Sequence, residues 1–221
     1  MQVVLDPLLD AETVAALRAQ LLSPEAEWID GAATAGWHAR GRKRNRQLQT
    51  TSGLHRVLAD QLQTALQAHP LLQAAAFPRC IHGILFSRCG IDEGYGRHVD
   101  NAWMAGGRSD VSFTLALSDP HAYEGGALVI ESPSGEESFR LQAGQALLYP
   151  STLLHRVDPV TAGERLVAVG WIQSRIRQVE QRELLFELDT ARRTLFERGG
   201  NDDVFDLVSR SYSNLLRRWD N

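Results

Sequence analysis

The chain has 221 residues, 43% hydrophobic and 23% charged, which is an ordinary composition for a globular protein with a sizeable core. A net charge of −4 excludes a general nucleic-acid-binding surface, and the lack of any stretch near ~20 apolar residues excludes a transmembrane helix. With two cysteines, Cys80 and Cys89, and no signal-peptide pattern, we expect a cytoplasmic protein with reduced thiols and no membrane partner.

Residues 1–77 are predicted to form a helical support region. One helix is expected to begin after Asp10, a residue that suits an N-cap. Its apolar side chains lie three and four residues apart: Val14, Leu17 and Leu21. A second helix is expected over residues 52–76, because Pro78 follows its end. Its apolar stripe consists of Leu54, Leu58, Leu62 and Leu66.

Residues 78–175 contain seven short apolar segments separated by Gly, Pro, Asp or Ser. The segments are HGILFSRC, DVSFTLALS, GGALVIES, ESFRLQAG, QALLYPS, LLHRVDPV and RLVAVGWIQS. Their lengths and spacing predict antiparallel strands in a sandwich or barrel. The expected fold class is therefore mainly β with flanking α.

Residues 176–221 are predicted to form two helices that pack on the strand region. The first helix is expected to end at Gly199 and Gly200. Its residues at helical spacing are Leu184, Leu188, Ala191 and Leu195. The second follows in NDDVFDLVSRSYSNLLRRWDN, whose acidic start suits a helix N-terminus. The pair has no cluster of metal-binding residue types, which favours a structural role or a homodimer interface.

The segment GYGRHVDNAW, residues 94–103, contains two residues of metal-binding type. One residue separates His98 from Asp100, so in an extended chain both side chains point to the same side. His155, in YPSTLLHRVDPV, offers a third ligand late in the strand region. Two histidines and one carboxylate form the facial triad of non-haem Fe(II) oxygenases, although a zinc hydrolase can use the same ligands.

Arg165, ten residues after His155, favours the Fe(II) oxygenase over the zinc hydrolase. In an alternating strand it shares its face with Val167, Val169 and Trp171. A guanidinium among apolar side chains needs a partner, and a bound carboxylate matches it in bidentate geometry. Pairing with Glu164 or Asp158 is the alternative that needs no ligand.

Together these segments resemble the bacterial PKHD-type hydroxylases of the Fe(II)/2-oxoglutarate dioxygenase superfamily, which are close to prolyl 4-hydroxylase catalytic domains. The matching segments span nearly the whole chain: EWIDG, KRNRQ, YGRHVDNA, RSDVSFTLALSDPHAYEGGALVI, YPSTLLHRVDPVTAGERLVAVGWIQSRIR, LLFELD and YSNLLRRW. The resemblance implies a jelly-roll or cupin-like double-stranded β-helix with N-terminal helices and a C-terminal helical appendage. It also implies that His98, Asp100 and His155 bind Fe(II). Arg165 is then expected to bind the C5 carboxylate of 2-oxoglutarate.

Three further residues are weaker candidates for contacts with 2-oxoglutarate. Ser112 and Thr114 are in phase on one expected strand, and Tyr149 precedes the strand that carries the second histidine. Packing or turn roles are the alternative for each. Cys89 stands where the family often has Tyr, so a hydroxyl group is missing there. The candidates for the pocket wall beside the first metal motif are Tyr95 and Trp103.

The implied activity is hydroxylation of an unactivated C–H bond with 2-oxoglutarate and O2, releasing succinate and CO2, with L-ascorbate as reductant. The substrate is open between a prolyl residue of a protein and a small molecule linked to iron uptake. The basic segment Arg40–Gln47 is either a solvated loop or a positive rim that attracts an anionic substrate. A sensor without turnover and a zinc-dependent hydrolase are the other functions that stay open.

Overall fold

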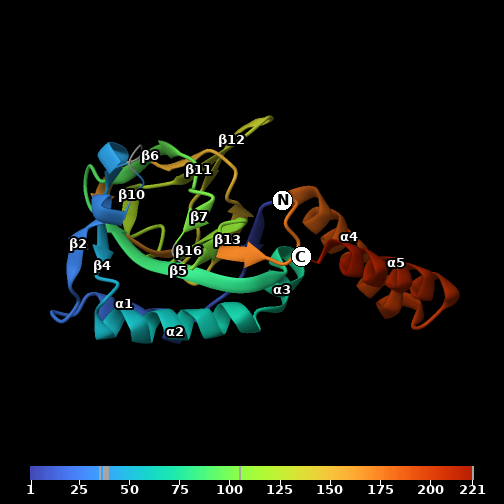
Figure 1. Ribbon diagram of the computed structural model, residues 1–221. Coiled ribbons are helices and arrows are strands. Elements are labelled where there is room, and N and C mark those ends of the chain that lie inside the picture. The colour runs from blue at the N-terminus through green and yellow to red at the C-terminus, as the bar shows by residue number, and fades with distance from the viewer. Residues whose placement is uncertain (35, 37–39, 105, 221) are drawn as a thin grey trace.

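Two antiparallel β-sheets face each other in the computed structural model, which describes residues 1–34, 36, 40–104 and 106–220 (Figure 1). In spatial order, the seven-stranded major sheet contains β1 (Val3–Leu5), β13 (Ala146–Pro150), β9 (Val111–Ala116), β16 (Arg165–Ser174), β5 (Pro78–Cys89), β4 (Arg46–Leu48) and β2 (Trp28–Asp30). The five-stranded minor sheet contains β12 (Gly135–Phe139), β11 (Leu128–Ser132), β14 (His155–Val157), β6 (Gly94–His98) and β3 (Lys43–Arg44). Two short pairs join β10 (Tyr123–Gly125) to β15 (Val160–Gly163) and β7 (Trp103–Met104) to β8 (Gly107–Arg108). The predicted fold class is confirmed.

Strand β9 lies in the interior of the major sheet and is buried on both faces. Successive side chains point to opposite faces, so they have different surroundings. Val111, Phe113 and Leu115 belong to the main hydrophobic core. Ser112 and Thr114 are buried on the opposite face and line a cavity between the sheets. The major sheet therefore has an apolar outer face and a partly polar inner face.

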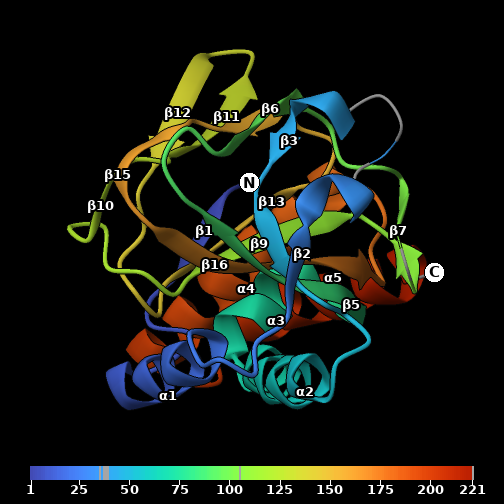
Figure 2. The ribbon, with the colours of Figure 1, turned by 90° about the vertical axis from the view of Figure 1, so that its left-hand side faces the viewer.

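Three helices cover the outer face of the major sheet (Figure 2). They are α1 (Ala11–Leu21), α2 (Gly53–Ala68) and α3 (Pro70–Ala76). Asp10 caps α1 by accepting a hydrogen bond from the backbone N–H of Thr13 at 2.8 Å. Ser52 caps α2 in the same way, at 3.0 Å from the backbone nitrogen of His55. The leucines that these helices contribute to the core include Leu17, Leu21, Leu58, Leu62 and Leu66.

The range 52–76 forms two helices, because Pro70 interrupts it. His69 follows the end of α2, and Pro70 is the first residue of α3. Proline has no N–H to donate to the preceding turn, and its ring clashes with the carbonyl four residues back, so it starts a helix but does not continue one. The prediction of one continuous helix is therefore wrong.

The N-terminal region also contributes strands to both sheets. β2 and β4 extend one edge of the major sheet, β1 forms the other edge, and β3 pairs with β6 in the minor sheet. Two 3₁₀ helices, η1 (Gly31–Thr34) and η2 (Arg40–Arg42), lie between β2 and β3. The expected helical support region thus also contains strands, which the sequence did not indicate because two or three residues are too few to show alternation. The division of the chain at residues 77 and 175 stays a prediction.

The C-terminal helices α4 (Val179–Gly199) and α5 (Asp203–Trp219) form a pair that extends away from the sheets (Figure 1). The buried residues of α4 are Arg182, Leu185 and Asp189. The leucine spacing chosen from the sequence does not mark this face, since Leu184 is 42% exposed. No helix in the described part of the chain has the length and apolar composition needed to cross a membrane.

Gly170, on β16, marks a position where the core has no room for a side chain. A β-carbon there would lie 2.7 Å from ring atoms of Phe113. We expect Gly170→Ala to lower the free energy of unfolding by about 1–3 kcal/mol, because the ring must leave its packed position. Urea unfolding measures this loss. Gly53→Ala is the control, because a β-carbon on Gly53 meets nothing within 4 Å; equal losses in both variants would contradict the packing explanation.

Candidate active site

A cavity of ≈ 80 Å³ lies between the two sheets and is lined by both. The residues that β16 contributes in alternation are Arg165, Val167, Val169 and Trp171. Those that β16 contributes to the hydrophobic core on the other face are Leu166, Ala168 and Ile172. The minor sheet contributes Tyr95, His98 and His155, among others. The in-phase arrangement expected around the arginine is therefore present.

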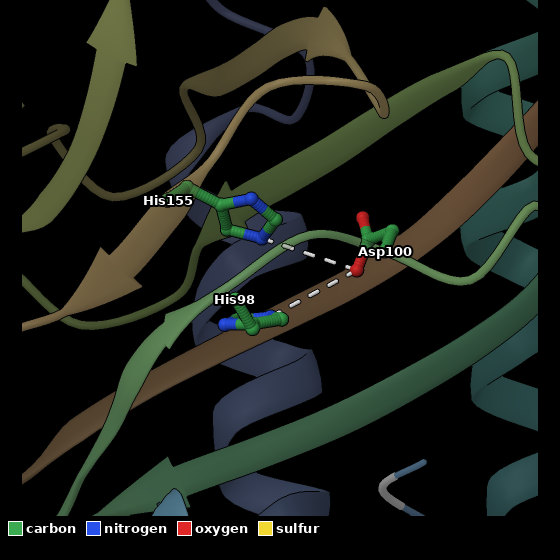
Figure 3. A group of neighbouring side chains, drawn as sticks. All are labelled: His98, Asp100 and His155. Atoms are coloured by element: carbon green, nitrogen blue, oxygen red, sulfur yellow. Dashed lines mark ion pairs between the residues drawn. The ribbon is translucent and has the colours of Figure 1, made fainter. Parts of the chain in front are cut away.

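His98, Asp100 and His155 point toward one another at this cavity (Figure 3). β14 pairs with β6 so that His155 lies directly opposite His98. Asp100 follows the end of β6, and its Oδ1 lies 3.9 Å from Nε2 of each histidine. This distance is too long for a hydrogen bond and shorter than two metal–ligand bonds of ~2.0–2.2 Å, so one ion fits between the three residues.

Backbone carbonyls fix the nitrogen that each histidine presents to the cavity. The Nδ1–H of His98 donates to the Gly96 carbonyl at 2.8 Å, and that of His155 donates to the Leu153 carbonyl at 3.0 Å. Because a carbonyl only accepts, the proton is on Nδ1 and the lone pair of Nε2 is free for a metal ion. Tyr95 stacks on His98 with ring centroids 3.6 Å apart and limits the rotation of that imidazole.

Two donors hold the second carboxylate oxygen of Asp100. The Ser112 hydroxyl donates to Oδ2 at 2.6 Å, and the indole N–H of Trp171 donates to the same atom at 3.0 Å. The sequence predicts that Trp171 lies on the inner face but indicates no role for it, because its partner Asp100 is 71 positions away. The predicted contact of Ser112 with a cosubstrate stays a prediction, since its hydroxyl already contacts Asp100 and Ser151.

Arg165 borders the same cavity and is only 6% exposed. The acids considered as its partners bind elsewhere. Glu164 lies 3.8 Å from Arg88, and Asp158 lies 2.8 Å from Arg156. Within the described residues, no carboxylate forms an ion pair with Arg165. Its buried charge therefore lacks a protein counter-ion, which favours an anionic ligand.

Thr114 and Tyr149, the other predicted cosubstrate contacts, line this cavity and are each 4% exposed. Burial raises the pKa of Tyr149, and the nearby Asp100 charge adds to the effect, so the phenol stays protonated. Cys89 is in the wall as well, and burial raises the pKa of its thiol. Trp103, by contrast, is 70% exposed on β7 and does not line the cavity.

The donor set determines what the cavity can bind. Two imidazole nitrogens and one carboxylate oxygen suit a first-row transition metal and leave coordination positions open for a cosubstrate. In the part of the chain that the structure describes, these three residues form the one cluster of potential metal ligands. With a buried guanidinium on the same wall, the cavity fits a metal ion together with an anionic chelator.

Residues 84–173 match the sequence model of the 2OG-Fe(II) oxygenase superfamily, and residues 180–221 match that of the PKHD-type hydroxylase C-terminal domain. The fold, the site and these matches define an enzyme of the class of 2-oxoglutarate- and iron-dependent oxygenases. A PKHD-type hydroxylase of Synechococcus elongatus is 55% identical, and one of Acaryochloris marina is 50% identical, each over 99% of both chains. The chain belongs to the PKHD-type hydroxylase family, as the sequence resemblance indicated.

Solved structures share the fold at lower identity. A prolyl-4-hydroxylase of Pseudomonas putida aligns with a TM-score of 0.55 and 22% identity, over 79% of this chain and 92% of that one. A viral collagen prolyl hydroxylase from Paramecium Bursaria Chlorella virus aligns with a TM-score of 0.52 and 15% identity, over 78% and 96%. The predicted double-stranded β-helix is confirmed. The family implies Fe(II) and 2-oxoglutarate as cofactors.

Acid should destabilise the metal-free protein through His98. Burial, and then the neighbouring His155, lower the pKa of His98 from 6.5 to about 4. Between these values the unfolded chain takes up a proton that the folded chain does not, so stability falls as the pH falls. In the wild-type protein this lowers the free energy of unfolding by roughly 3 kcal/mol between pH 6.5 and 4, and we expect that decrease to be absent in His98→Gln.

Denaturant titrations in the presence of a chelator measure the effect. His121→Gln is the control, because His121 is exposed and does not line the cavity. A pH dependence of His98→Gln that equals that of the wild-type protein would refute the assignment to this residue.

The two donors to Asp100 should strengthen metal binding. Trp171→Phe and Ser112→Ala each remove one hydrogen bond to Oδ2. We expect each variant to bind Fe(II) or Co(II) about 10–100-fold more weakly, because the carboxylate is no longer fixed toward the histidines. Anaerobic metal titration measures this, with exposed Trp103→Phe as the control. Unchanged affinity in both variants would show that Asp100 needs neither donor.

Proposed function

We propose that this enzyme hydroxylates an unactivated C–H bond, using Fe(II), 2-oxoglutarate and O2 and releasing succinate and CO2. His98, Asp100 and His155 bind the iron, and Arg165 binds the C5 carboxylate of 2-oxoglutarate. The supporting observation is that one cavity combines three convergent ligand atoms with a buried guanidinium that has no counter-ion among the described residues. A zinc hydrolase requires the three ligands but not the guanidinium.

The residues of the chain bind, orient and shield the reactants. Arg165 presents a fork of N–H donors that matches a carboxylate in bidentate geometry, and so fixes the distal end of 2-oxoglutarate. Thr114 and Tyr149 present hydroxyl groups to the same cavity. Val167 and Val169 provide apolar surface that limits the entry of water. Bound Fe(II), with 2-oxoglutarate and O2, supplies the oxidation itself.

Cys89 favours a second candidate, a sensor that binds metal and 2-oxoglutarate without turnover. It lies directly across from Arg165 in the pairing of β16 with β5. The family often has Tyr at this position, and the thiol does not supply the hydroxyl that Tyr would place there. Metal binding with no oxygen consumption under any condition would support the sensor over the hydroxylase.

L-ascorbate is the reductant that restores Fe(II) after uncoupled turnover. The substrate is a prolyl residue of a protein, by analogy with the prolyl hydroxylases among the similar structures, or a small molecule linked to iron uptake. We also propose a cytoplasmic location, in keeping with the free thiols of Cys80 and Cys89, and a homodimer formed through the terminal helices.

Arg165→Ala should weaken 2-oxoglutarate binding about 100-fold, because two charge-assisted hydrogen bonds are lost. Anaerobic titration of the Fe(II) protein with 2-oxoglutarate measures binding, and succinate formation measures turnover. Arg88→Met is the control, since Arg88 stacks on Trp28 outside the cavity wall. Tight binding that survives in Arg165→Ala would remove the assigned anchor, and wild-type protein that makes no succinate would contradict the turnover.

A further inference from the structure

The basic segment divides into two rows with different environments. The buried residues are Lys43, Asn45 and Gln47, and the exposed ones are Arg42, Arg44 and Arg46. All three buried side chains line the cavity that contains the metal ligands. The segment is therefore not only a solvated loop, because strand alternation turns every second residue inward.

Lys43 also lines a second hollow, which lies beside the metal site. This hollow shares Tyr95, His98 and Asp100 with the inner cavity. Its wall includes residues at the protein surface, such as Val99 and Asn101. Arg165 lines the inner cavity and not this hollow. Two buried cations are therefore available to two different ligands.

Among the residues that the structure describes, the ammonium group of Lys43 has few partners. The residue is 8% exposed and donates to the Thr34 hydroxyl at 2.8 Å. Thr34 in turn donates to the Gln47 side-chain oxygen at 2.5 Å, so it meets Lys43 as an acceptor. The ammonium also lies 5.3 Å from the centroid of the Tyr95 ring.

No ion pair joins Lys43 to a carboxylate within the described ranges. An ammonium has three donors, and among the described residues Thr34 accepts one of them, so the other two can meet a ligand. Burial lowers the pKa of Lys43 to about 8, and the Asp100 charge opposes that shift, so the group is mostly charged at pH 7. A buried charge of this kind is stabilised by an anion.

We propose that Lys43 binds a carboxylate of the substrate whose C–H bond is oxidised. The inference rests on the proposed hydroxylase function and defines the substrate class as carboxylate-bearing, either a small organic acid or an acidic peptide. 2-Oxoglutarate is the rival occupant. The structure favours the substrate because Arg165 already offers 2-oxoglutarate a bidentate partner, whereas Lys43 reaches the hollow that includes surface residues.

The test measures carboxylate binding to protein that contains zinc(II) and saturating 2-oxoglutarate, so that no turnover occurs. The small-acid probe is N-acetyl-L-proline, compared with N-acetyl-L-prolinamide. The peptide probe is an end-blocked tripeptide with a glutamate side chain, compared with its glutamine counterpart. We expect the wild-type protein to bind at least one acid about tenfold more tightly than its neutral counterpart, as a charge-assisted hydrogen bond provides. The probe that shows the preference identifies the source of the carboxylate.

Lys43→Met removes the charge at similar length and should abolish the preference, whereas Lys43→Arg should retain it. Arg44→Met is the matched control, because Arg44 is the exposed neighbour on the same strand. Unchanged 2-oxoglutarate affinity in Lys43→Met shows that this variant is folded. The proposal is overturned if the wild-type protein prefers neither acid, or if the preference survives in Lys43→Met. It is also overturned if Lys43→Met loses as much 2-oxoglutarate binding as Arg165→Ala does.

Failure of this inference is distinguishable from failure of the proposed function. A wild-type protein that forms succinate but shows no acid preference would contradict the role of Lys43 alone. An acid preference without succinate formation under any condition would contradict the turnover and leave the carboxylate site in place.

Discussion

The pairing of β14 with β6 is the constraint on which the site depends. It sets His155 opposite His98 and brings their ring centroids to 4.2 Å from each other. A slip of one residue would turn one imidazole away from the cavity. Gly94 permits the close approach of the strands, because a β-carbon there would lie 2.7 Å from the Val157 carbonyl oxygen. The ligand geometry is thus a property of backbone hydrogen bonding as much as of side chains.

The cationic side chains in the cavity wall have no ion-pair partners among the described residues, and this determines the electrostatic character of the cavity. Arg165 and Lys43 are both buried, and neither forms an ion pair with a carboxylate in the described chain. His98 is held neutral by burial, which depresses its pKa. The protein thus provides positive charge at Arg165 and Lys43, and the negative charge of Asp100 is directed at the metal position between the two histidines. Once a metal ion is bound by Asp100 and the two histidines, these two positive side chains favour anionic organic ligands over neutral ones.

The strands of the central region and the four main site residues could be predicted from the sequence, because alternation and the His-x-Asp, His and Arg pattern are local signals. Strands β1 to β4 could not be predicted, because their two or three residues show no periodicity. Nor did it reveal the Trp171–Asp100 hydrogen bond or the inward turn of Lys43, since both depend on which strands become neighbours. In α4 the leucine spacing predicted the wrong buried face, because the helix buries Arg182 and Asp189.

The burial of Arg182 links the C-terminal helices to the folding of the barrel. Its guanidinium donates to the backbone carbonyls of Ile176, at 2.7 Å, and Asp110, at 3.5 Å. The Asp110 carboxylate accepts from the backbone N–H of Ser174 at 2.9 Å, which joins the start of β9 to the end of β16. Detaching the helices would remove the Arg182 donor from the buried Ile176 carbonyl, so the sheets and the helix pair are expected to unfold as one cooperative unit.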